Sequence, residues 1–246
     1  MAVPRQLSRP PITEALLDIK AAVSAPREAY EALSRELQPR YPQIEHRRGL
    51  RAEWKVEDGK VIQSADDLGF QGVHMRSDDG HAVVQFRPDG FTFNNLSSYM
   101  GGDRLIVEAL GLWDVFVAHT KPVAVSRVGL RFINQLKLPF QVGDEFSRFL
   151  TAAPPTPEGA PQQVSEFLSR VVASEPGEFL ATVIMTQQLT LPEPNAPLVV
   201  LDVDVFREDE FPPDSRSLRV VVDDLRRAKN RAFFSLLTDA AVNLYG

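Results

Sequence analysis

The stretch PVAVSRVGLRFINQLKLP, residues 122–139, is the longest clean alternating run in the chain and lies close to its centre. Its even positions are mostly apolar and its odd positions carry most of the polar side chains, the period expected of a strand with one buried face. Gly129 is typical of a bulge or of a close approach by another backbone, and Asn134 places an amide on the apolar face. We predict a central β-strand whose buried side chains include Val128, Leu130, Phe132, Leu136 and Leu138.

The region before this strand predicts a mixed arrangement of strands and helices. Acid–glycine pairs separate short alternating runs there, which is the pattern of hairpin turns in an antiparallel meander. We expect a strand over 12–23, a helix over 26–38, the meander over 50–95 and a second helix over 104–119.

The region after the central strand contains a proline-rich segment, residues 152–162, which we interpret as a connector. Periodicity predicts the remaining elements. We expect short helices near 142–150 and over 162–173, strands over 179–191 and 198–206, an acidic loop over 207–215 and a long helix over 216–237.

Residues 1–121 and 122–246 show a similar order of expected elements: strand, helix, meander or hairpin, and long helix. There is no residue-level repeat at a fixed period, so a diverged duplication is a hypothesis that rests on this order alone. We predict an α+β fold with an antiparallel sheet and helices mainly on one face, formed by two such halves within one compact unit.

Composition excludes several classes of site. The 246-residue chain has no cysteine, which removes disulfides, thiolate nucleophiles and cysteine-ligated metals. Residues 151–246 hold 14 acidic and 8 basic side chains, while 1–150 hold 19 of each, so nucleic acid is not an expected partner. No apolar run could span a bilayer and the N-terminus lacks the apolar core of a signal peptide; we therefore expect no membrane contact and a cytosolic location.

Catalytic signatures are missing from the sequence. It contains no phosphate-binding loop, dinucleotide fingerprint, nucleophile elbow or HExxH motif, and its four histidines lie in different segments. We predict a non-enzymatic binding or interaction protein with an unknown protein partner, and expect no cofactor and no metal. The alternative is an enzyme or binding protein for a small phosphorylated or carboxylated ligand.

Four charged residues are the main candidate ligand contacts. Arg127 and Arg131 lie on the polar side of the central strand, and Asp202 and Asp204 share one side of the strand expected over 198–206. We expect all four on one face of the sheet, with at least one arginine–aspartate pair in contact. Three interpretations stay open: a structural ionic lattice, a surface for an anionic ligand, and an oxygen-ligand site for a cation such as magnesium.

Asn134 is the fifth candidate, because a buried amide is costly unless it is hydrogen-bonded. Its expected partners are backbone groups, with a ligand as the alternative. Lys229 and Asn230, on the last long helix, are interpreted as an exposed turn of that helix.

Three segments carry a resemblance to a known family: PITEALLDI from Pro11, VGLRFIN from Val128, and KNRAFFSLLTD from Lys229. Together they make the chain similar to a sporadically distributed family of uncharacterised bacterial proteins of about this length. Members have a GLRYIN-like central strand, from which Phe132 departs by lacking the tyrosine hydroxyl. The resemblance implies a shared fold and no assigned activity, so it assigns no functional residue.

Overall fold

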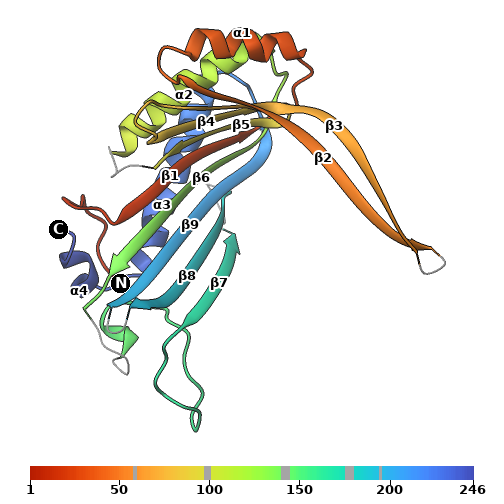
Figure 1. Cartoon of the computed structure of the whole chain (residues 1–246). Helices are drawn as coiled ribbons and strands as arrows, with labels where there is room; N and C mark the ends of the chain where they lie inside the picture. The colour runs from red at the N-terminus through yellow and green to blue at the C-terminus, as the bar shows by residue number, and fades with distance from the viewer. Residues whose placement is uncertain (58–59, 97–100, 140–144, 175–179, 194–195) are drawn as a thin grey trace.

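The computed structural model describes residues 1–57, 60–96, 101–139, 145–174, 180–193 and 196–246. Its described residues form a nine-stranded antiparallel sheet and four α-helices (Figure 1). The strand order is β2-β3-β4-β5-β1-β6-β9-β8-β7.

The first half of the chain contains β1 (Ile12–Lys20), α1 (Arg27–Leu37), β2 (Gln43–Glu57), β3 (Lys60–Arg76), β4 (Ala82–Arg87), β5 (Gly90–Asn95) and α2 (Gly102–Thr120). The second half contains β6 (Val125–Lys137), the 3₁₀ turn η1 (Phe146–Arg148), β7 (Phe167–Ser174), β8 (Thr182–Glu193), β9 (Ala196–Phe211), α3 (Ser215–Ser235) and α4 (Asp239–Asn243).

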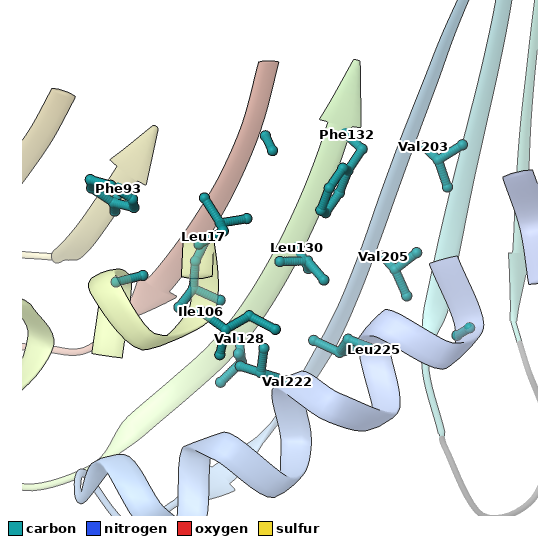
Figure 2. Close-up of a cluster of buried hydrophobic side chains, with 14 of the residues drawn as sticks. Leu17, Phe93, Ile106, Val128, Leu130, Phe132, Val203, Val205, Val222 and Leu225 are labelled. Atoms are coloured by element: carbon teal, nitrogen blue, oxygen red, sulfur yellow. The ribbon is translucent and has the colours of Figure 1, made fainter. Parts of the chain in front are cut away.

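The predicted central strand is confirmed as β6, which pairs with β1 on one side and β9 on the other. Alternation places its apolar residues on the side of the helices, where Leu130 lies opposite Leu17 of β1. Figure 2 shows these two side chains in a cluster with Val128 and with Ile106 and Leu225 from α2 and α3. The core therefore lies between the sheet and the helices.

Helix α3 packs on β6, β8 and β9, and α2 packs on β1 and β5. Leu218, Val222 and Leu225 form the buried stripe of α3, as predicted. The side chain of Asp214 caps this helix by accepting a hydrogen bond of 2.8 Å from the backbone N–H of Ser217. The α+β class, with an antiparallel sheet and helices on one face, is thus confirmed.

The two halves have matching topology around the β1–β6 pair. In the first half, β1 lies beside the last strand of its meander, and β5, β4, β3 and β2 follow outward. In the second half, β6 lies beside β9, and β8 and β7 follow outward. In each half a long helix, α2 or α3, follows the last strand and packs on the same face of the sheet. This matching order agrees with the duplication hypothesis, which stays a prediction.

Several predicted elements need correction. The expected helix over 162–173 is wrong, because Phe167–Ser174 forms the edge strand β7. The expected acidic loop over 207–215 is wrong in its first part, because β9 continues to Phe211. Near 142–150 the structure describes only the short turn η1, and residues 140–144 lie outside the described residues. The connector over 152–162 contains no helix or strand, as expected.

The outer parts of β2 and β3 form a two-stranded arm, defined here as residues 48–57 and 60–69. It projects from the edge of the sheet (Figure 1), because β3 pairs with β4 only over the four residues from Val73 to Arg76. One face of the arm carries exposed apolar side chains, of which Trp54 is 65% exposed. The others on that face are Leu50, Val56 and Val61.

No helix in the described ranges is long and apolar enough to cross a membrane.

Candidate functional site

The charged face predicted from the sequence exists on the side of the sheet opposite the helices, called here the open face. Arg131 makes a two-pronged contact with Asp202, with Nε–Oδ1 and Nη2–Oδ2 distances of 2.8 and 2.5 Å. Arg127 lies 3.0 Å from Asp18 of β1 and 3.8 Å from Asp204. The prediction that the four residues share one face, with at least one arginine–aspartate pair in contact, is confirmed.

Gly129 has a specific role on this face. A Cβ atom at this position would lie 2.7 Å from Nη1 of Arg127, so the missing side chain leaves room for the guanidinium. There the guanidinium stacks on the ring of Phe206, 4.2 Å from the ring centre. The register of β6 is regular at Gly129, so the expected bulge is wrong: a side chain, and not another backbone, makes the close approach.

We predict that Gly129→Ala lowers the free energy of unfolding by at most about 1 kcal/mol, because the new methyl group displaces only the flexible end of the Arg127 side chain from Asp18 and Phe206. Chemical denaturation measures this change. In an Arg127→Ala background the same substitution should have little effect. Gly111→Ala is the matched control, since it lies in the interior of α2 with open space around it and should be neutral or stabilising. Equal losses at both glycines would contradict this role of Gly129.

The charges on the open face neutralise one another. Asp202 is paired with Arg131, and Asp204 lies within reach of Arg127. Burial raises the pKa of Asp204, while the nearby Arg127 and Arg131 oppose this shift. Among the residues that the structure describes, no group of three acidic or histidine side chains could hold a metal ion. The geometry therefore favours the ionic-lattice interpretation, and ligand binding by these four residues stays a prediction.

Asn134 lies on the other face of β6 and is separated from those four residues. Its Nδ2 donates to the backbone carbonyls of Leu201 and Phe132, at 3.0 and 3.3 Å, so the expected backbone partners are present. The same residue also lines a cavity of about 790 Å³. The structure therefore keeps Asn134 as a candidate, but at a different site.

This cavity, the α3 cavity, is lined by the N-terminal segment, the beginning of α2, the end of β6 and one side of α3. Each of the three segments that carry the family resemblance contributes to its wall, although they are far apart in the sequence. They provide Ile12, Asn134 and Lys229, respectively.

Lys229 is the unusual residue of the cavity. The residue is only 8% exposed, and its Nζ lies 4.0 Å from the centre of the Phe132 ring. No carboxylate in the described part of the chain pairs with it. The nearby Asp103 instead contacts Arg226, at 2.6 Å, and Arg219, at 3.5 Å. Burial, and secondarily the charge of Arg226, lowers the pKa of Lys229 to about 7.

The expectation that Lys229 lies on an exposed turn is wrong. Its position continues the buried stripe of α3 at spacings of three and four residues, so helical periodicity alone would have predicted that it faces the core. Its charge led to the opposite interpretation, because lysine is rarely buried without a partner.

The lining of the α3 cavity is electropositive. Among the described residues that line it, four are basic and one, Asp103, is acidic; the basic ones are Arg5, Arg104, Arg226 and Lys229. The N-terminus of α2 also faces it, with Gly101 in a positive-φ conformation of 97° before the first turn. Helix N-termini attract negative charge, so both features favour an anionic ligand.

Comparison with known proteins found no protein-family model that matches the chain and no matching curated protein. Membership of the family that the three segments resemble therefore stays a prediction.

Proposed function

We propose that this chain is a binding protein for a small anionic molecule, phosphorylated or carboxylated, held in the α3 cavity. The observation that carries the proposal is Lys229, a buried amine that lines the cavity and has no carboxylate partner among the described residues. A buried ammonium without a counter-charge is costly, and a bound anion would supply that counter-charge. The proposed ligand site is thus moved from the open face, where Arg127 and Arg131 already have acidic partners, to the cavity.

The test is thermal unfolding with inorganic phosphate, citrate and chloride at matched ionic strength. A ligand at a hundred times its dissociation constant stabilises a protein by about 2.7 kcal/mol, so binding raises the melting temperature. We expect phosphate or citrate to raise it, and expect the effect to be lost in Lys229→Met.

The matched control is Lys137→Met, which removes an exposed lysine outside the α3 cavity and should keep the response. Equal stabilisation of the wild type and Lys229→Met would reject this site. No stabilisation of the wild type by either multivalent anion would reject the proposed function.

A second candidate function is interaction with a protein partner, favoured by the exposed apolar face of the arm. An isolated two-stranded hairpin is marginally stable in water, so a partner that covers Leu50, Trp54 and Val56 would stabilise it. Arg51 lies opposite Asp66 in the register, so the charges on the other side of the arm offset each other and do not favour a charged partner. We infer that the partner is a second copy of the chain, since two-fold pairing would bring the two apolar faces together.

Sedimentation equilibrium tests this second candidate. The wild type should be a dimer that Trp54→Ser dissociates, while Val123→Ser, at another exposed valine, should leave it intact. A wild-type monomer at all concentrations would reject self-association. The cytosolic location expected from the composition stays a proposal.

A further inference from the structure

We propose that Lys229 forms a reversible imine with a small aldehyde or ketone that carries a carboxylate or phosphate group. This inference rests on the proposed function, because the same cavity would hold the anionic group of the molecule. It adds a chemical class of ligand and a covalent step, neither of which anion binding alone requires.

The surroundings of Lys229 favour the neutral amine, which is the form that attacks a carbonyl carbon. The residue is only 8% exposed and has no carboxylate partner among the described residues, and Arg226 precedes it by three positions on α3. The lowered pKa of Lys229 follows from this burial and from that neighbouring charge. A desolvated lysine beside a second cation is a known arrangement for an amine nucleophile.

The charged groups around the amine divide into two roles. Asp103 is engaged by Arg226 and Arg219, so its carboxylate does not fix Lys229 in the charged form. Arg104 and Arg5 line the same cavity and have no carboxylate partner among the described residues, so their charge can attract the anionic group of the ligand. Arg5 also donates to the side chain of Asn243, which ties the N-terminal wall of the cavity to α4.

Asn134 adds a hydrogen-bond acceptor, its side-chain oxygen, to the basic residues that line the cavity. Its Nδ2 is occupied by two backbone carbonyls, and no hydrogen bond within the described residues engages its Oδ1. A carbonyl oxygen at the cavity wall accepts a hydrogen bond from a hydroxyl group, which the addition step below creates.

The chemistry is balanced without an oxidant or a reductant. The nitrogen lone pair of Lys229 attacks the carbonyl carbon, and proton transfer from nitrogen to oxygen gives a carbinolamine. The carbinolamine then loses its hydroxyl group and the remaining N–H proton as one water molecule, and the C=N bond forms. Hydrolysis reverses the sequence, so the ligand is held covalently but not permanently.

Reductive trapping tests the inference. The full-length protein is incubated at pH 7 with glyoxylate or glyceraldehyde 3-phosphate and cyanoborohydride, and peptide mass mapping locates the modified amines. The chain has six lysines, and each is an internal comparison for the others. At pH 7 about half of Lys229 is neutral, against fewer than ~0.1% of an ordinary lysine, so we expect its labelling to exceed that of Lys137 by at least about tenfold.

Two further measurements keep the result interpretable. Excess inorganic phosphate should slow labelling of Lys229 in the wild type, and propionaldehyde, which has no anionic group, should label it more slowly than glyoxylate. Lys229→Arg should lose the adduct at position 229, while its charge preserves stabilisation by phosphate.

Each outcome separates the two proposals. No adduct at Lys229 together with stabilisation by phosphate would overturn the imine and leave the proposed function intact. No adduct and no stabilisation would overturn both. Equal labelling by propionaldehyde, unaffected by phosphate, would overturn the anionic class of the carbonyl ligand.

Discussion

Replacing Lys229 with methionine should raise the free energy of unfolding at pH 7 by roughly 4 kcal/mol. The pKa of Lys229 is about 7 in the folded protein, whereas an unperturbed lysine titrates near 10.4. The unfolded chain therefore binds more protons between these two values. Methionine fills a similar volume and removes the charge that must be desolvated.

The difference between the pKa of Lys229 in the folded and unfolded states also determines how the free energy of unfolding depends on pH. Wild-type stability should rise as the pH increases from about 7 to about 10.4, because the folded amine is already neutral in this range, while the proton binding that favours the unfolded state weakens as the pH approaches 10.4. Below pH 7 the full penalty is present. Urea denaturation of the wild type and Lys229→Met across this range measures the difference, which should shrink as the pH rises. A less stable Lys229→Met at pH 7 would show that the ammonium has a stabilising partner.

Truncation of the centre of the core should have an effect of similar size in the opposite direction. Leu130→Ala and Phe132→Ala should each lower the free energy of unfolding by roughly 2–5 kcal/mol, because both side chains are buried between β6 and the helices (Figure 2). Phe132→Ala also removes the ring that lies under Lys229, so its effect should differ between the wild type and a Lys229→Met background.

The matched control for these truncations is Leu168→Ala on β7. This leucine is 69% exposed, and its truncation should change the free energy of unfolding by less than about 0.5 kcal/mol. Chemical denaturation of the three variants gives the comparison. A loss at Leu130 no larger than that at Leu168 would contradict the assignment of the buried face.

Strand faces at the centre of the sheet were predictable because burial on one side imposes a period of two. Val203 and Val205 are buried and Asp202 and Asp204 lie on the opposite side, as their alternation predicts. The edge strand β7 was missed for the converse reason. Its apolar residues Leu168, Val171 and Val172 are exposed, so it lacks a regular alternation and resembles a helical segment.

The candidate site was less predictable than the fold. The Arg131–Asp202 contact follows from two strand faces, and Asn134 was expected to be buried with backbone partners. The α3 cavity depends on tertiary packing that joins the N-terminal segment to α2 and α3, which local periodicity does not describe. In the sequence, the position of Lys229 on the helix predicts that it is buried, but its residue type predicts that it is exposed.

The β1–β6 pair at the centre of the sheet also determines when the protein can fold during translation. Leu17 pairs with Leu130, so one edge of β1 stays open after the first half has emerged from the ribosome. At typical elongation rates the intervening chain takes on the order of 10 s to synthesise. An open edge of this kind is a template for pairing with other chains. The nascent first half therefore exposes a strand edge that promotes aggregation, and slower translation of the region before β6 should lower the soluble yield.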